Sequence, residues 1–553
     1  MNCRRVRLPG GCGRNRCSWM GCTGPYTSRR MPRLTSTGWL PRLVVGTAVL
    51  TLVLGSGLPG RPVAAAGPPL RYLAGEVQTL DPAFIGSASD VQLLLQLYAG
   101  LTRLDEDGEP YPSLAESWTV NDDGRTYTFR LREDLTFSDG SPLRAEDVRR
   151  SWLRVLDPAT ASSAPDVLSI IDGAPQRLAG GSEDDVAVAA RDDRTLEVRL
   201  RHAASYFPAV AATPTAFVVP SHADASPDWQ DPDAFVGSGP YVADGFDGAD
   251  LVLRANAHYV AGAPPIDEVR WIADIEGDAV TAYAADELDL VGVAPFDASW
   301  IAYDPDLGPA LHQAAALNVQ YFGFDTSQPP FDDVRVRQAF ALVLNRPRLV
   351  ELAEGNGARA ASSVVPPALW PDGMRDDHRT DVDAARALLD EAGYADRSDL
   401  GVVTVNGSGL GVDPAVAVWR AELGVEVAIE GMEFLDYLSA LDEHRLQVFT
   451  VNWIADYPSP YALYSLLLLP DAASNYGSWQ DDAFVALLEE ASAAEGEAAQ
   501  AAAYQAVDAH VDEQVPVIPW AYGTGWWLVR PGLRGLGNLT TGLLDFGRVS
   551  WDA

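Results

Sequence analysis

The stretch Trp453–Pro460, which reads WIADYPSP, carries the residue types best suited to binding chemistry. It follows an apolar segment, Gln447–Val451, that has the composition of a buried strand, so it lies where that strand ends. Ligands of α/β proteins bind outside the carboxyl ends of strands. Asp456 stands between aromatic residues, and a carboxylate in a partly dry cleft needs a positive partner because burying it alone is costly. A ligand ammonium group would be such a partner; a structural arginine, or a turn capped by Asp456, is the alternative.

The sequence lacks the common catalytic motifs. There is no G-x-S-x-G nucleophile elbow, because Gly407-Ser408-Gly409 has a different spacing, and there is no H-E-x-x-H metal motif. The seven histidines are scattered singly. We therefore expect no catalytic residue, no metal site and no cofactor. A secreted hydrolase that uses paired carboxylates is the remaining enzymatic alternative in so acidic a chain, and incubation with peptides would reveal it by cleavage.

Composition and length limit the class of protein. The 553 residues suffice for two or three domains, and 47% hydrophobic with 21% charged residues is an ordinary globular balance. The formal net charge is -37, lysine is absent, and all 77 acidic residues follow Ala66. Such a surface repels nucleic acid and anionic membranes, so neither is expected as a partner. It favours cationic ligands, although solubility is the more common reason for an acidic surface.

Residues 1–66 have the pattern of a secretory signal peptide. An arginine-rich region without acids precedes a short apolar run at Leu43–Leu54, and Val63–Ala66 supplies the small residues of a cleavage site. Met31 is an alternative start that would leave a conventional signal length. All four cysteines precede this site, so the mature chain is expected to have neither disulfides nor a cysteine-bound metal. An extracytoplasmic location follows from this reading.

The elements that must position the site follow an α/β pattern. Tyr127, Phe129 and Leu131 alternate with polar residues, which predicts a strand with one buried face, and a helix with acids in its first turn begins at Ala145. The continuous apolar segments Val402–Val405 and Val425–Ile429 are typical of parallel strands. Further strands are expected at Leu70–Leu73, Val186–Val188 and Thr195–Leu200, and further helices at Val91–Leu101, Asp383–Gly393, Ala483–Ala494 and Ala498–His510.

Six irregular residue strings, in four segments of the chain, are more specific than this pattern. They are LAESW, DDG-x-x-Y-x-F-x-L-R and F-x-DGSPL-x-AEDV within Leu114–Val148, GSGPY at Gly237–Tyr241, PFDD-x-R-V-R-Q-A at Pro330–Ala339, and VPVIPW at Val515–Trp520. Together they resemble the extracytoplasmic solute-binding proteins of ABC transporters, in the peptide/nickel-binding group that includes oligopeptide- and dipeptide-binding proteins.

This resemblance implies an α/β chain with the two-lobed, type II periplasmic-binding-protein fold. Lobe 1 would comprise residues 67–317, with an extra subdomain at about 106–230, and lobe 2 residues 318–514. Residues 515–553 would return to lobe 1. Two crossings between lobes make a hinge, and the cleft between them is a natural ligand site.

The resemblance also assigns roles within the cleft. In peptide-binding members the W-x-A-D-Y motif, here Trp453–Tyr457, places its aspartate on the α-amino group of the peptide, which implies this role for Asp456. Trp453 and Tyr457 would line side-chain pockets, with core packing as the alternative. Asn475 in SNYGSW and Ser87 in the loop 85–89 are further candidates for ligand binding.

One departure from the family concerns the ligand carboxylate. Members that hold short peptides often carry an arginine three residues before the tryptophan, and Thr450 occupies this position here. Threonine cannot make a bidentate clamp on a carboxylate, so the ligand would be longer, be held elsewhere, or lack a carboxylate.

We therefore expect a monomeric receptor that captures peptides and delivers them to the permease subunits of an ABC importer. Binding of another small solute, such as an oligosaccharide or a nickel chelate, is the main alternative, and a signalling receptor would use the same binding chemistry. Related proteins of Gram-positive cells carry a lipid-anchored cysteine at the cleavage site, and this chain has none there. How the protein would be retained at the membrane stays open.

Overall fold

The computed structural model describes residues 67–552 except 106–107, 225–226, 354–356, 371–377, 408–410, 456, 495, 538 and 540–542. The expected signal peptide and all four cysteines lie outside the described residues, as does Asp456. All that follows concerns the unit Ala64–Ala553. Within its described part, no helix combines the length and apolarity needed to cross a bilayer.

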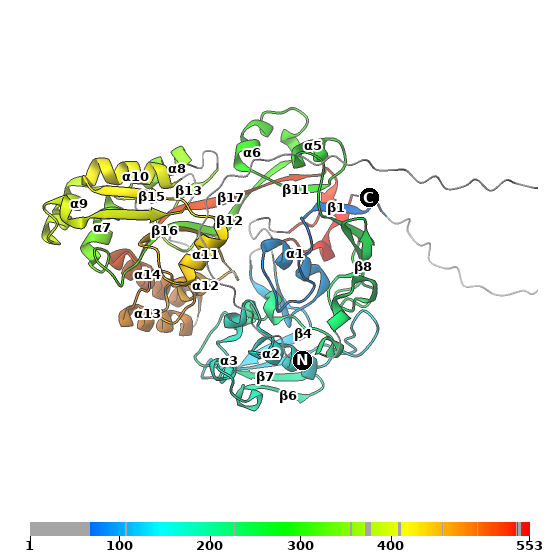
Figure 1. Cartoon of the computed structure of the whole chain (residues 1–553). Helices are drawn as coiled ribbons and strands as arrows, with labels where there is room; N and C mark the ends of the chain where they lie inside the picture. Colours follow the sequence, from blue (N-terminus) through cyan, green and yellow to red (C-terminus); the bar gives the residue numbers. More distant parts are fainter. Residues whose placement is uncertain are drawn as a thin grey trace, which may run out of the picture. The chain divides into compact units, whose positions relative to one another are not determined.

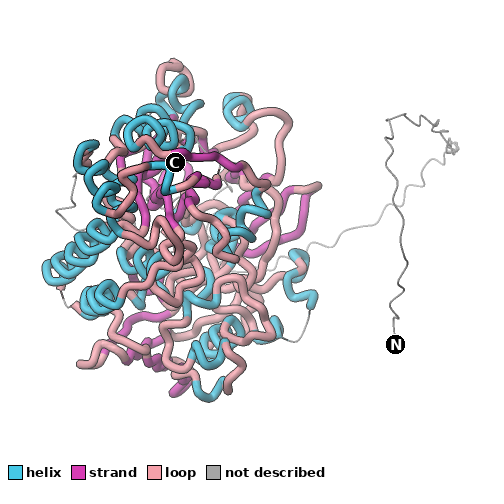
Figure 2. The backbone as a smooth tube through the Cα atoms, turned by 60° about the vertical axis from the view of Figure 1, so that its left-hand side comes forward, coloured by secondary structure: helices cyan, strands magenta, loops and turns pink. Residues whose placement is uncertain are grey.

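A large mixed sheet runs through the described chain and forms its framework (Figure 1). Its strands follow the order β15-β14-β16-β12-β17-β11-β1-β10-β9-β8, and β13 pairs with β17 beside this path. Helices pack on it throughout (Figure 2). The strands are β1 Leu70–Leu73, β8 Tyr241–Asp247, β9 Asp250–Ala255, β10 Glu268–Ile272, β11 Leu290–Val293, β12 Leu311–Phe324, β13 Arg359–Ala360, β14 Val402–Asn406, β15 Glu426–Glu430, β16 Val448–Ile454 and β17 Val517–Val529.

Two long antiparallel strands, β12 and β17, join the two halves of this sheet. Strands β11, β1, β10, β9 and β8 continue the sheet beyond β17, and we call this half lobe 1. Strands β16, β14 and β15 continue it beyond β12, and we call this half lobe 2. The expected boundary at 317/318 falls within β12, and the one at 514/515 falls where α14 (Glu497–Gln514) ends. We retain both as proposed boundaries, because β12 and β17 belong to both lobes.

A separate four-stranded sheet, with the order β4-β5-β7-β6, lies in the segment where an extra subdomain is expected (Figure 1). It is covered by α2 (Ala145–Val155), whose Val148 and Trp152 are fully buried with Phe129 of β5. The alternating residues predicted to face the core are buried accordingly. These strands are β4 Ala115–Val120, β5 Thr126–Leu131, β6 Val188–Asp192 and β7 Thr195–Arg199.

The remaining elements pack around these sheets. The two other short strand pairs are β2 Thr102–Leu104 with β3 Pro110–Pro112, and β18 Leu533–Arg534 with β19 Ser550–Trp551. The helices not yet named are α1 Ala88–Leu97, α3 Ala174–Leu178, α4 Phe207–Val210, α5 Ala279–Ala284, α6 Pro295–Ile301, α7 Val334–Leu342, α8 Arg346–Ala353, α9 Val382–Glu391, α10 Val412–Val418, α11 Phe434–Asp442, α12 Pro460–Leu468 and α13 Asp482–Ala493.

Two expected elements are displaced in the structure. The helix expected at Val91–Leu101 is α1, which starts earlier because Ser87 caps it by accepting the Asp90 amide at 3.1 Å. It ends at Leu97, where Gly237 and Gly239 of the GSGPY turn approach its backbone more closely than any Cβ would allow. The strand expected at Val186–Val188 lies instead at Val188–Asp192, because the following turn sets its register against β7.

The string at Pro330–Ala339 includes an arginine that stabilises lobe 2. Arg337 is buried, and its guanidinium donates to the carbonyls of Phe331 (2.7 Å), Gln514 (2.7 Å) and Val515 (3.0 Å). Burial lowers the pKa of Arg337 to about 10, so the group stays cationic at neutral pH. Arg337 therefore binds the carbonyl end of α14 directly before the chain enters β17.

Replacing Arg337 by alanine should lower the free energy of unfolding by about 2–4 kcal/mol, because three buried carbonyls lose their donor. The matched control is Arg335→Ala, whose partly exposed side chain pairs with Asp333; it should cost about 1 kcal/mol or less. Urea unfolding of the two variants measures the difference. Equal losses would contradict this role of Arg337.

Candidate ligand-binding site

The carboxyl end of β16 offers an unpaired strand edge. β14 pairs with β16 only at Val405↔Val448 and Asn406↔Phe449, and then ends. β16 continues to Ile454. Its residues 449, 451 and 453 bond β12, as Ala455 does when its amide donates to the Leu317 carbonyl (2.9 Å). The alternation of a strand therefore turns the amides and carbonyls of Asn452 and Ile454 toward the side that β14 has left.

Tyr437 of α11 marks where this edge begins. Its hydroxyl donates to the carbonyl of Thr450 at 2.8 Å and accepts from the amide of Thr450 at 3.1 Å. Burial raises the pKa of Tyr437 to about 12, so the hydroxyl stays protonated and can make both bonds at neutral pH. Thr450 is thus satisfied by a side chain. Among the described residues, we find no partner for the backbone groups of Asn452 and Ile454 on the same side.

The sheet beside this edge presents a polar floor. Asn318 and Gln320 of β12 lie opposite Ile454 and Asn452, and cross-strand partners share one face of a sheet. Asn318 donates to the side chain of Asn452 (2.9 Å) and accepts from the amide of Gly523 on β17 (2.7 Å). A cavity of about 200 Å³ is lined by Asn318, Gln320 and Gly523, with Pro295 of α6 in its wall. The side chain of Asn318 on β12 thus bonds both β16 and β17.

Tyr457 belongs to an aromatic stack that joins the lobes. Tyr206, from the segment of the extra subdomain, lies between Tyr461 (ring centroids 4.3 Å apart) and Tyr457 (5.7 Å). His202 Nε2 lies 3.4 Å from the hydroxyl of Tyr461. All three tyrosines are buried, and burial raises the pKa of Tyr206 and Tyr461. Tyr457 is therefore held against the segment of the extra subdomain.

A cavity of about 470 Å³ lies beside this stack. Its walls come from both lobes and carry charges of both signs: Asp166, Arg201, His202 and Tyr206 on one side, Tyr457, Tyr461, Asp471 and Glu489 on the other. It is large enough for a ligand side chain. It is the interlobe cavity nearest in sequence to the W-x-A-D-Y motif.

The predicted site residues have different places. Trp453 is half-buried on β16, packs against the core, and its indole nitrogen has no partner among the described residues. Asn475 is buried, donates to the carbonyls of Leu469 and Trp479, and accepts from the Trp479 amide, so its bonds hold a turn. Ser87 is exposed and caps α1. The structure places Trp453 on β16 beside the open edge and Tyr457 in the aromatic stack; Asn475 is held in its own turn.

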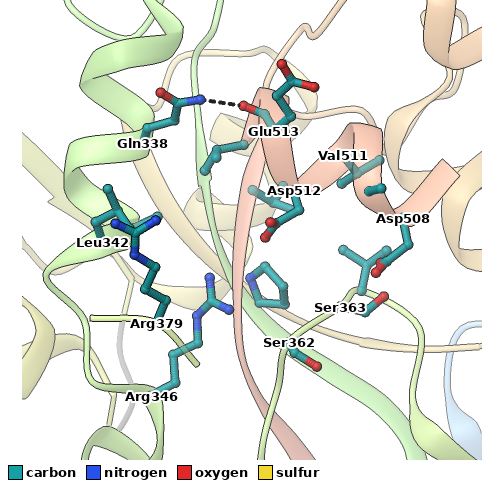
Figure 3. A pocket seen from close by; sticks show the side chains of 16 residues that line it. Gln338, Leu342, Arg346, Ser362, Ser363, Arg379, Asp508, Val511, Asp512 and Glu513 are labelled. Atoms are coloured by element: carbon teal, nitrogen blue, oxygen red, sulfur yellow. Dashed lines mark hydrogen bonds between the residues drawn. The ribbon is translucent and has the colours of Figure 1, made fainter. Parts of the chain in front are cut away.

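A further cavity of about 450 Å³ lies within lobe 2, beside the start of β17. Figure 3 shows Arg346 and Arg379 on one side of it and Asp508 and Asp512 on the other. Gln338 donates to the carbonyl of Glu513 across its rim (2.8 Å). Opposite charges face one another here. The lining includes no residue from the carboxyl ends of β14 or β16. We assign this cavity no part in the site.

Known proteins are similar to this chain in sequence and in fold. Residues 109–475 match the model of the bacterial extracellular solute-binding proteins, family 5. The chain belongs to this family. The described α/β architecture is accordingly the type II periplasmic-binding-protein-like fold that was predicted.

Individual relatives cover nearly the whole chain. A protein of Escherichia coli (strain K12) named Probable deoxycholate-binding periplasmic protein YgiS is 31% identical over 475 residues, 83% of this chain and 88% of the relative. The periplasmic oligopeptide-binding protein OppA of the same organism is 29% identical over 524 residues, which are 91% of this chain and 95% of the relative. The structure of the Escherichia coli murein tripeptide binding protein MppA superposes with a TM-score of 0.74 at 25% identity, covering 88% and 99%.

Removing the hydroxyl of Tyr437 tests its role at the strand edge. Tyr437→Phe should lower the free energy of unfolding by about 1–2 kcal/mol, because both backbone groups of Thr450 lose their partner. Tyr303→Phe is the control, since that side chain is 88% exposed and should leave stability unchanged. Urea unfolding measures both. An equal free energy of unfolding in the two variants would contradict a stabilising role for the bonds between the Tyr437 hydroxyl and Thr450.

Proposed function

We propose that this member of the family is an extracytoplasmic receptor that binds peptides in extended form and hands them to an ABC importer. The observation that supports it best is the open edge at Asn452 and Ile454. A peptide lying along this edge would extend the sheet by one strand, with main-chain bonds that do not depend on its sequence. The relatives named as oligopeptide-binding and murein tripeptide binding agree with this ligand class.

Asp456 has its proposed place two residues beyond Ile454, at the end of the same edge. A peptide paired with Asn452 and Ile454 would bring one terminus there, and an ammonium group would neutralise the carboxylate. We infer this role from the sequence motif and from its position after β16. Trp453 and Tyr457 would form walls of the site, and Ser87 would contribute from lobe 1. Asn475 would act only through the turn that it holds.

A non-peptide ligand is the second candidate. Relatives are named as deoxycholate-binding and heme-binding, and aromatic side chains flank the interlobe cavity here. An oligosaccharide or a nickel chelate belongs to the same alternative. We propose no covalent step, no cofactor and a monomeric receptor outside the cytoplasm, with permease subunits as its partner.

Backbone-methylated peptides test the proposed pairing. In a bound strand only every second amide faces β16, so methylation should abolish binding at alternate peptide bonds and leave the others unaffected. Calorimetric titration of an otherwise identical peptide series provides the measurement. Mass spectrometry of any co-purifying ligand complements it. Equal tolerance of methylation at every position would contradict strand pairing, and cleavage of the peptides would favour the hydrolase instead.

The role of Asp456 is tested by a double change. Asp456→Asn should weaken binding of a free peptide at least tenfold, because a charged hydrogen-bonded partner of the ammonium group is lost. Acetylating the peptide's amino group should weaken binding to the unaltered protein similarly. The two changes together should add little. Independent, additive losses would place the ammonium group elsewhere.

A further inference from the structure

We infer that the ligand strand carries large apolar side chains and no net negative charge, because the wall beside the open edge is apolar and acidic. This inference rests on the proposed function and names the class of peptide that the same site selects. It starts from a group of exposed hydrophobic side chains that the fold does not cover. They lie on α11, directly before it and at the end of β16: Met432, Phe434, Leu435, Leu438 and Ile454.

The position of α11 places this wall next to the edge. Tyr437 of α11 bonds the backbone of Thr450, so the helix lies directly against β16. Phe434 precedes Tyr437 by three residues and shares its face of the helix, one turn nearer the helix start. Met432 Sδ lies 3.7 Å from Nδ2 of Asn406, the last residue of β14. Residues 432–438 therefore run past the point where β14 ends and β16 goes on alone.

The exposure of these side chains is large for apolar groups. Phe434 is 71% exposed, Leu435 76% and Ile454 51%. Single exposed apolar residues are ordinary on a protein surface, but several of them along one segment beside a binding edge favour a surface that a ligand covers. Ile454 projects from the same face of β16 as Asn452, so a strand paired there would lay alternate side chains on this group.

The charges of the same segment select against acidic ligands. Between Arg420 and Arg445 the charged residues are all acidic apart from His444, and Glu430, Glu433 and Asp436 are exposed among the apolar side chains. Thr450 supplies no cation for a ligand carboxylate, and its backbone is held by Tyr437. An anionic ligand side chain would meet like charges with no counter-charge on this wall. Apolar or cationic peptides would meet no such repulsion.

Pentapeptides of alanine that carry one phenylalanine or one aspartate at successive positions test this inference, with calorimetric titration as the measurement. Phenylalanine should raise the affinity about tenfold or more at alternate positions, and aspartate at those positions should lower it to a similar extent. Phe434→Ala and, separately, Ile454→Ser should remove most of the gain from phenylalanine. Both side chains are mainly exposed, so neither change should unfold the protein.

Phe246→Ala is the matched control, because Phe246 is 53% exposed on β8, the far edge strand of lobe 1. It should leave the preference for phenylalanine intact. Peptides that bind equally well with alanine, phenylalanine or aspartate at every position would overturn the inference and leave the proposed function standing. If no peptide binds and the anionic deoxycholate does, both fall.

Discussion

Strand β16 continues past the last residue of its neighbour β14, and within the described residues Thr450, Asn452 and Ile454 have no strand beside them on that side. Asn452 and Ile454 are exposed, so the free amides and carbonyls of this edge can bond water or an added strand unless the protein blocks them. At Thr450 the protein blocks it with the hydroxyl of Tyr437. At Asn452 and Ile454 it does not, within the part of the chain that the structure describes. The proposed location of the site, the proposed extended form of the ligand and the proposed role of α11 all rest on this difference.

The long strands β12 and β17 bring both lobes to this edge. Asn318 bonds Asn452 on one side and Gly523 on the other, so the floor of the site is built from the crossing strands themselves. At the last residue of the W-x-A-D-Y motif, Tyr457, the ring stacks on Tyr206, which also stacks on Tyr461. If the lobes moved relative to each other, residues close to the proposed ligand site would therefore move as well. Contacts made by a ligand there could then stabilise one arrangement of the lobes over another.

Much of the fold could be predicted because long residue strings encode it. The apolar segments at Val402–Val405 and Val425–Ile429 were expected as parallel strands, and they form β14 and β15 in parallel register. The GSGPY string has a structural role, since Gly237 and Gly239 pack against the end of α1. The boundaries of α1 and β6 were missed, because a serine cap and a hairpin register decide them.

The site was only partly accessible from the sequence. The motif pointed to Trp453 and Tyr457, but the open edge depends on where β14 stops relative to β16, and no local pattern encodes this. Tyr437 and Asn318 were missed for the same reason, since each acts on a strand distant in sequence. Asn475 was chosen from a motif, and its amide is used within its own turn.

Hydrogen exchange of single amides, measured with and without bound peptide, tests the open edge most directly. The account predicts that the peptide strongly protects the amides of Asn452 and Ile454, while Thr450, already bonded to Tyr437, changes little. Protection that appears only around other parts of the cleft, with Asn452 and Ile454 exchanging at their unliganded rates, would contradict it.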